Sequence, residues 1–363
     1  MDKHLFKFFY TGKIVPVLVL ALALILAHGC TLNPNSIGHL ESNAPNETAQ
    51  DLMVYFCPKD DCGKVLEGHI LSANQSVYCA FYDMNLKNVM NSLSKKSKIV
   101  DTRLVMDRSN AKGVARGNVR LGGNGQLMHN KFCAIDGKIV LTGSFNPTDN
   151  DNYRNNNNMV VINSRFLAKN YEEEFMEMWN GDFGKGKKSP YRNFHINGID
   201  IENYFCPEEC SMQYPLMNKD GALSRILELI GDAKISVMVA SYTFSNKKIA
   251  DELVKAHTLG INVTIITESR QRNVQGSQYM RLKDIGIKIL LDGNKYNMHH
   301  KFIVIDGKII VIGSPNFTLS GFDKNDENML IIFDEKMASK YAEEFNMLRE
   351  SAAVKEIKNE KSN

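Results

Sequence analysis

MHNKFCAIDGKIVLTGSFN occupies residues 128–146, and MHHKFIVIDGKIIVIGSPN occupies residues 298–316. Each stretch reads His-x-Lys, four residues, Asp, six residues, Gly-Ser-x-Asn. Side chains two apart in a strand lie on one face, so each histidine points the same way as its lysine. The Gly-Lys-Ile run after the aspartate predicts the return strand of a hairpin. Repetition of so long a pattern indicates that the fold is a duplication.

Similarity continues on both sides of these two stretches. The matching segments are YFCP at 55–58 and 204–207, SVYCAFY at 76–82 and SVMVASY at 236–242, and YEEEF at 171–175 and YAEEF at 341–345. From the motif histidines to the last phenylalanines the offset stays at 170 residues without a gap. A chain of 363 residues is long enough for two such units to share a large core.

Each copy reads as strands alternating with helices, then a hairpin, another strand and a closing helix. This order predicts an α/β fold of two tandem repeats, each a mostly parallel sheet flanked by helices. Pairing about a pseudo-twofold axis would bring both motifs to one site within a monomer, as in a symmetric dimer. The expected divisions are a targeting segment at 1–29, a polar tether at 30–50, repeats at 51–185 and 186–350, and a polar tail at 351–363.

The first thirty residues predict export. Three lysines precede an apolar run at 14–27, whose fourteen residues at about 1.5 Å each fall short of a hydrocarbon core of about 30 Å. A cleaved signal peptide is therefore favoured over a membrane span. AHGC at 27–30 resembles a bacterial lipobox, which predicts lipidation of Cys30 and a membrane-anchored lipoprotein in the periplasm or on the cell surface. An ordinary signal peptide and an uncleaved anchor are the alternatives.

Cysteine usage suits an oxidising compartment. After Cys30 the chain has two close pairs and two isolated cysteines: Cys57 and Cys62, Cys206 and Cys210, Cys79, and Cys133. The close pairs predict local disulfides, with free thiols or a shared zinc site as alternatives. The isolated cysteines lie in strand-like runs and are interpreted as small core residues.

The net charge of the chain does not favour nucleic acid as the ligand. The net charge is +3, and residues 1–29 supply three lysines and one aspartate, so the rest carries about +1. Tight nonspecific binding to nucleic acid draws on many cationic contacts, which a near-neutral body does not favour.

The two motifs together predict an anion site. Two imidazoles and two ammonium groups would converge, with neutral donors beside them and no carboxylate pair or cysteine cage suited to a metal. One histidine can attack while the other protonates the leaving oxygen, and the lysines and amides can hold the nonbridging oxygens. The candidate catalytic residues are His129, Lys131, Asn146, His299, Lys301 and Asn316, with Ser144 and Ser314 as substrate-binding residues. We expect no metal and no cofactor.

Asp136 and Asp306 belong to the same motifs but lie five residues beyond the lysines. Strand parity places them on the opposite face from the histidines. We interpret both as structural, anchoring a loop or balancing charge.

The paired pattern resembles the phospholipase D superfamily over about residues 50–350. The resemblance implies cleavage of a phosphodiester through a phosphohistidine, which water or an alcohol resolves without a metal. It also implies that an acidic residue downstream orients each histidine. Glu327 stands 28 residues after His299, whereas Asn157 stands 28 after His129. Since a carboxylate favours the charged imidazole, we expect His299 with Glu327 to be the general acid and His129 with Asn157 the nucleophile.

The superfamily acts on several phosphodiesters, so the substrate is a separate question. A phospholipid at a membrane surface, with water as acceptor, is favoured because an N-terminal anchor would keep the site at its substrate. An endonuclease acting on DNA or RNA is the main alternative, and cardiolipin-synthase-like phosphatidyl transfer is a third. Basic loops at 106–126 and 268–284 could contact a nucleic-acid backbone or anionic headgroups, or could be solvated surface.

Overall fold

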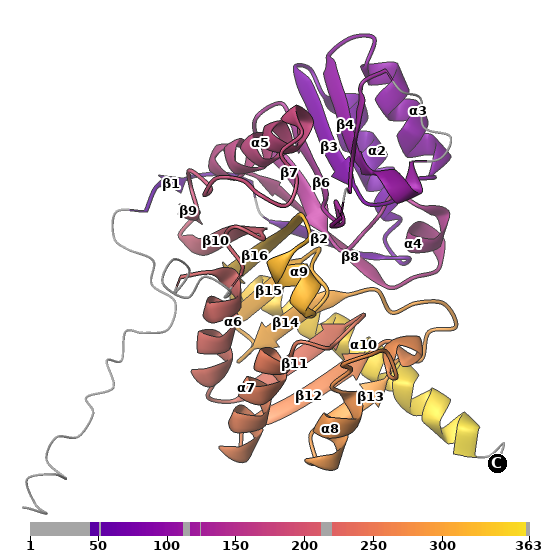
Figure 1. Ribbon diagram of the computed structural model, residues 1–363, viewed down its shortest axis with the longest axis vertical. Helices are drawn as coiled ribbons and strands as arrows, with labels where there is room; N and C mark the ends of the chain where they lie inside the picture. Colours follow the sequence, from indigo (N-terminus) through magenta and orange to yellow (C-terminus); the bar gives the residue numbers. More distant parts are fainter. Residues whose placement is uncertain (1–43, 51, 112–116, 124, 212–219, 361–363) are drawn as a thin grey trace, which may run out of the picture. The chain divides into compact units, whose positions relative to one another are not determined.

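The computed structural model describes residues 44–50, 52–111, 117–123, 125–211 and 220–360 (Figure 1). The predicted targeting segment, Cys30 and the tether up to residue 43 lie outside the described residues. Among the described helices, none combines the length and the apolar character needed to cross a membrane.

The first repeat begins with strand, helix, strand, helix, strand, as expected. Its elements are β2 (Met53–Cys57), α2 (Cys62–Ser72), β3 (Ser76–Phe81), α3 (Lys87–Lys96), β4 (Asp101–Asp107), β5 (Val119–Gly122), β6 (Lys131–Ile135), β7 (Ile139–Gly143), α4 (Asp149–Tyr153), β8 (Asn157–Asn163) and α5 (Arg165–Asn180). The closing helix α5 starts where the Ser164 side chain accepts the Leu167 amide and ends at Gly181, whose φ of 101° suits glycine.

The second repeat follows the same order. Its elements are β10 (Ile199–Cys206), α6 (Ala222–Gly231), β11 (Ser236–Ser241), α7 (Lys247–Thr258), β12 (Asn262–Thr267), α8 (Tyr279–Asp284), β13 (Lys288–Leu291), β14 (Lys301–Ile305), β15 (Ile309–Gly313), α9 (Leu319–Asp323), β16 (Glu327–Phe333) and α10 (Glu335–Glu360). Two further strands, β1 (Asn46–Glu47) and β9 (Asn193–Ile196), extend its sheet beyond β10.

Two stretches that we expected to be unstructured contain regular elements. Residues 46–47 of the predicted tether pair in parallel with β9, and the Ala49 amide donates to Asn197 Oδ1 at 3.0 Å. At the other end, α10 continues to Glu360, so the predicted polar tail begins as helix. Composition alone did not show either feature, because a polar strand or helix can be held by backbone pairing.

Each sheet is mixed, whereas we expected mostly parallel strands. The seven-stranded sheet has the order β2-β8-β7-β6-β3-β4-β5, and the nine-stranded sheet the order β1-β9-β10-β16-β15-β14-β11-β12-β13. Among the described strands of the first repeat, only β3, β4 and β5 are parallel neighbours. The motif hairpin and the strands after it run antiparallel, because tight turns reverse the chain.

Three apolar clusters account for the layers. One joins α2 and α3 to a face of the first sheet, and another joins α6 and α7 to a face of the second (Figure 1). The third is central and contains side chains of both sheets together with α5 and α10, including Phe132, Tyr171, Phe302 and Tyr341. The two repeats therefore share a core.

Backbone pairing also crosses between the repeats beside each motif. Met128 forms a parallel bridge with Asp326, and Met298 forms the matching bridge with Asn156. His129 N donates to the Asp326 carbonyl at 2.9 Å, and His299 N donates to the Asn156 carbonyl at 2.8 Å. Each motif histidine is thus tied to the residue that precedes the last strand of the other repeat.

The six cysteines that the structure describes form three disulfides. The close pairs join as Cys57–Cys62 and Cys206–Cys210, as predicted, which leaves no thiols for the alternative zinc site. Cys79 and Cys133, interpreted as separate core residues, are bonded to each other. They are direct partners in the antiparallel pair β3 and β6, a neighbour relation that only the folded sheet creates.

Candidate active site

Each histidine and lysine of a motif lies at the start of a central strand. Lys131 and Lys301 are the first residues of β6 and β14, and the histidines come two positions earlier. Each ammonium donates to the carbonyl of its own motif histidine, Lys131 to His129 at 2.7 Å and Lys301 to His299 at 2.6 Å. Both lysines are only 1% exposed, so the motifs hold positive charge where little solvent reaches it.

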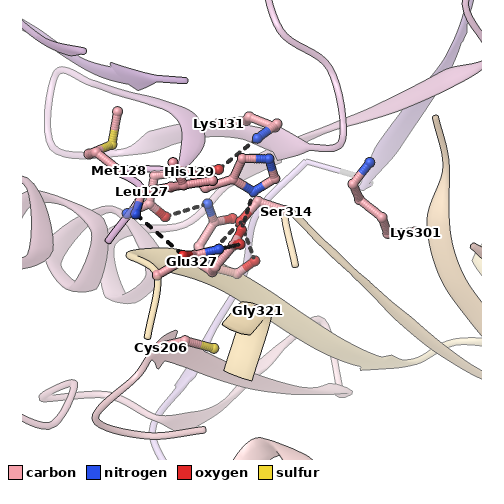
Figure 2. A network of polar contacts seen from close by, with 12 residues as sticks. Leu127, Met128, His129, Lys131, Cys206, Lys301, Ser314, Gly321 and Glu327 are labelled. Carbon is pink, nitrogen blue, oxygen red and sulfur yellow. Dashed lines mark hydrogen bonds and ion pairs between the residues drawn. The ribbon is translucent and has the colours of Figure 1, made fainter. Parts of the chain in front are cut away.

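The orienting partners of the histidines come from the opposite repeat. Glu327 Oε2 lies 2.7 Å from His129 Nδ1 (Figure 2), and Asn157 Oδ1 lies 2.8 Å from His299 Nδ1. We expected Glu327 on His299 and Asn157 on His129, and that pairing is wrong. The bridges Met128–Asp326 and Met298–Asn156 are the reason, since they place the first residue of β16 beside His129 and the first residue of β8 beside His299.

The two motif serines contact these partners. Ser144 Oγ donates to Asn157 Oδ1 at 3.0 Å, and Ser314 Oγ donates to Glu327 Oε2 at 2.6 Å (Figure 2). We expected the hydroxyls to bind substrate. Instead each hydroxyl proton is directed to the group that orients a histidine, because the return strand of the hairpin lies next to β8 or β16.

The two motif asparagines differ in their surroundings. Asn146 donates to Asp151 Oδ2 through its backbone N at 2.9 Å and through Nδ2 at 3.0 Å. The buried Oδ1 of Asn316 has no hydrogen-bond partner within the described residues. A buried polar atom without a partner is unfavourable, so Asn316 Oδ1 is placed to accept a hydrogen bond from a bound group that carries a proton.

Two tyrosines complete the site and were not among the predicted residues. The Tyr82 ring lies 4.9 Å from the His129 ring, and the Tyr242 ring lies 4.9 Å from the His299 ring. The ammonium groups of Lys131 and Lys301 lie over the same tyrosine rings at 5.4 and 5.2 Å. Both tyrosines end the repeated segments SVYCAFY and SVMVASY, so the duplication itself was a signal that could have revealed them.

The pKa values of the site reflect burial of positive charge. Burial lowers the pKa of His129 below its usual 6.5, although Glu327 opposes this. Burial, then Lys301 and Lys131, hold the pKa of His299 well below 6.5. Burial also lowers the pKa of Lys131 to about 8, and that of Lys301 well below 10.5. An anion placed among these groups would offset the unfavourable burial of their charge.

At Glu327 the neighbouring groups outweigh the effect of burial on the pKa. Its burial alone would raise the pKa of the carboxyl. The charges of His129 and Lys131 and the hydrogen bonds from His129 and Ser314 lower that pKa below 4.5. Glu327 is therefore ionised across the physiological range. A carboxylate can only accept, so His129 Nδ1 carries a proton and donates it to Glu327 Oε2. The His129 Nε2 lone pair is then free when the ring is neutral.

Asp136 and Asp306 lie at the hairpin turns, away from the histidines. Asp136 accepts the amides of Asn74, Gln75 and Ser76 at 2.7–3.0 Å. In the second repeat Asp306 accepts the matching amides of residues 234–236. No three side chains of His, Cys, Asp or Glu gather to hold a metal ion in the part of the chain that the structure describes.

A family model described as "Cardiolipin synthase, PLD-like domain" matches the chain twice, at residues 66–179 and 226–349. The mitochondrial cardiolipin hydrolase of Xenopus laevis is 35% identical over 168 residues, which cover 45% of this chain and 79% of that protein. The enzyme of the same name from Chlamydomonas reinhardtii is 29% identical over 166 residues, covering 42% and 74%.

One solved structure matches across most of the chain. The phosphatidylserine synthase of Haemophilus influenzae superposes with a TM-score of 0.62 and 12% sequence identity, covering 85% of this chain and 88% of that protein. At that identity the match shows a shared fold of two repeats and no more.

The names of the relatives contradict the predicted location. We expected an exported, membrane-anchored bacterial lipoprotein, whereas the matched hydrolases are named as mitochondrial enzymes. A basic segment followed by an apolar run is typical of more than one kind of targeting sequence, so residues 1–29 did not specify the compartment.

Proposed function

Because the chain belongs to the phospholipase D superfamily and is a phosphodiesterase of that kind, we propose that it hydrolyses a phospholipid with a cardiolipin-like phosphodiester. The observation that carries the proposal is the meeting of both His-x-Lys motifs within one chain, each histidine held by the other repeat. The names of the hydrolase relatives support the substrate class and favour a mitochondrial location.

In the proposed reaction His129 is the nucleophile, although the contact with Asn157 from which we first expected this role belongs to His299. The reason is now the Glu327 carboxylate at His129, which can stabilise the positive ring of the intermediate. His129 Nε2 attacks phosphorus, the bond from phosphorus to the leaving oxygen breaks, and His299 Nε2 gives that oxygen a proton. The resulting phosphohistidine carries positive charge on the ring, which the Glu327 carboxylate at Nδ1 stabilises, as a carboxylate stabilises imidazolium in a Ser-His-Asp triad. Water then attacks phosphorus, His299 takes its proton, and the bond between phosphorus and nitrogen breaks.

The remaining site groups hold the phosphate. Lys131 and Lys301 face its nonbridging oxygens, and Asn146 and Asn316 add neutral donors. The steps need no metal and no cofactor. Since one chain supplies both motifs, we expect the monomer to be active.

The proposed function is tested with the full chain and two lipids, cardiolipin and phosphatidylcholine, each in vesicles containing EDTA. Single- and double-stranded DNA and RNA form parallel assays. We expect cardiolipin to yield phosphatidate and phosphatidylglycerol, and the His129→Ala variant to be inactive. Cleavage of nucleic acid without cleavage of lipid would show that the substrate is a nucleic acid and not a phospholipid. Loss of all activity in EDTA would overturn the metal-independent mechanism.

A matched control comes from a second histidine–carboxylate pair outside the site. His195 on β9 has its Nδ1 2.7 Å from Asp200 Oδ1. The His195→Asn variant should retain the activity of the unmodified protein, which would exclude a general effect of losing a histidine–carboxylate contact.

A further inference from the structure

One carboxylate near the histidines has no counterpart in the other repeat. Asp151 lies on α4 and is 4% exposed, and its Oδ2 is 3.7 Å from His299 Nδ1. The offset of 170 residues places Gly321 at the equivalent position on α9. Besides Asn146, Asp151 accepts Asn155 Nδ2 at 2.7 Å through Oδ1, so its carboxylate is held in place by both oxygens.

Gly321 leaves no space for a side chain at the equivalent position. A Cβ atom there would lie 2.4 Å from the Asn316 carbonyl oxygen. Figure 2 shows Gly321 on the far side of Glu327 from His129. The His129 side therefore has a carboxylate in direct contact and a glycine on the short helix, whereas the His299 side has an amide in direct contact and a carboxylate on the short helix.

His299 is otherwise surrounded by groups that disfavour its protonation or are neutral. The groups that face it are Lys301, Lys131, His129, His300, Tyr242 on the segment after β11, Asn157 on β8 and Asp151 on α4. The first four lower its pKa after burial, and Asn157 contributes no charge. An imidazole that must deliver a proton needs a negative neighbour, and Asp151 is the carboxylate placed to be one.

We propose that Asp151 is a positioning residue for His299, supplying from α4 the negative charge that Asn157 does not supply from β8. This inference rests on the proposed function, in which His299 is the general acid. Asp151 does not touch the reacting atoms and acts through the Nδ1 side of the imidazole. In this half of the site the carboxylate lies at Asp151, six residues before Asn157, which occupies the position that Glu327 has in the other repeat.

The test compares the full chain with Asp151→Asn, which has nearly the same shape and keeps one acceptor oxygen for Asn146 while losing the acceptor for Asn155. Loss of the charge should lower the pKa of His299, so we expect the basic limb of the pH profile of kcat/KM to move to lower pH. Asp151 also raises the pKa of Lys131 and Lys301, so the titration of His299 itself, described below, assigns the shift. A move of about one unit makes activity about tenfold lower at a fixed pH above the limb. Asp149→Asn, which removes an exposed carboxylate from the same helix, should leave the profile unchanged.

A second substitution tests whether a carboxylate at the position of Asn157 can replace the one at Asp151. Asn157→Asp places a carboxylate directly at His299 Nδ1, so it should move the basic limb to higher pH and, in the Asp151→Asn background, restore it. A uniform loss of activity with an unmoved limb and no restoration would mean that Asp151 only anchors Asn146, and would overturn the proposal.

A measurement that needs no turnover separates this proposal from the proposed function. Histidine titration by NMR in inorganic phosphate should show a lower pKa for His299 in Asp151→Asn than in the unmodified chain. An unchanged pKa would overturn the role of Asp151 even if the enzyme is active. If the chain cleaves no phosphodiester but the pKa falls, the electrostatic role stands and the proposed function fails.

Discussion

Glu327 ends in a carboxylate and Asn157, one methylene shorter, ends in a neutral amide, and they are positioned to give the two histidines different roles. The carboxylate contacts His129, where it can stabilise the positive ring of a phosphohistidine, and the amide contacts His299. A neutral amide fixes the orientation of a ring but adds no charge. We therefore infer unequal roles from a contact between repeats, although the motifs themselves are nearly identical.

Glu327→Gln tests this inequality. We expect kcat to fall roughly 10³- to 10⁴-fold, as when a triad carboxylate is replaced by an amide. Asp200→Asn removes the carboxylate 2.7 Å from His195 outside the site and should have no effect. A fall of less than about tenfold in Glu327→Gln would show that His129 does not need the charge.

Trapping the intermediate tests the nucleophile independently. With a phosphodiester whose leaving oxygen needs no proton, such as a nitrophenyl ester, His299→Ala should accumulate a phosphorylated enzyme labelled on His129, because the nucleophile is present while the base for the second step is missing. The label is located by peptide mapping of quenched enzyme. Label on His299 alone in the unmodified enzyme would reverse the two roles.

At the scale of elements, the two motif hairpins are tied to the sheet by their aspartates. Asp136 and Asp306 adopt left-handed φ values of 54° and 52° at the turns, and each accepts amides at the start of the neighbouring strand. Those amides hold the pKa of Asp136 below 3.8 despite the opposing effect of burial. The contribution of a lowered carboxyl pKa to stability is present above the unfolded pKa and is lost as the pH falls through the folded value.

Asp306→Asn should lower the free energy of unfolding by about 1–3 kcal/mol, because asparagine tolerates the left-handed turn but is a weaker acceptor for these amides. The value of kcat should stay within about twofold, since Asp306 lies away from the histidines. Denaturant unfolding and steady-state kinetics measure the two quantities. The exposed Asp284→Asn on α8 is the control, and a large loss of kcat with unchanged stability would refute the structural role.

At the scale of the whole molecule, carboxylates are buried near the cross-repeat bridges. Burial raises the pKa of Asp326 to about 8 and that of Glu208 to about 7, and burial also raises the pKa of Glu174. Asp326 is central to this group, since its backbone N donates to the Leu127 carbonyl and its own carbonyl accepts His129 N. Its Oδ2 has no hydrogen-bond partner within the described residues.

These raised pKa values predict how stability depends on pH. A carboxyl whose folded pKa is raised contributes stability that is present below its unfolded pKa and lost as the pH rises through the folded value. Asp326 stays protonated in the folded chain up to about pH 8, whereas an unfolded aspartate is ionised well below that pH. Stability should therefore fall between about pH 6.5 and 8, at up to about 1.4 kcal/mol per pH unit from Asp326. Thermal melts across this window should show a smaller fall in Asp326→Asn. An equal fall would show that Asp326 does not titrate there.

The duplicated motif determined much of the molecule without reference to its folded form. The repeat of His-x-Lys and Gly-Ser-x-Asn predicted two units, a hairpin in each and one shared site, because strand parity and turn chemistry are local properties. Tyr82 and Tyr242 were within reach of the same reasoning, since both end a repeated segment. The prediction of mostly parallel sheets was wrong, because the number of antiparallel strands depends on how the hairpins pack against the rest of each sheet.

Tertiary structure alone decided which groups meet at the site. Glu327 is 198 residues from His129, and Asn157 is 142 from His299, so no local pattern connects either pair. The serines contact the same partners, Cys79 meets Cys133, and Asp151 reaches His299 without a repeated counterpart. The physical reason is the pair of bridges Met128–Asp326 and Met298–Asn156, which join each motif to the opposite repeat through backbone groups that every sequence carries.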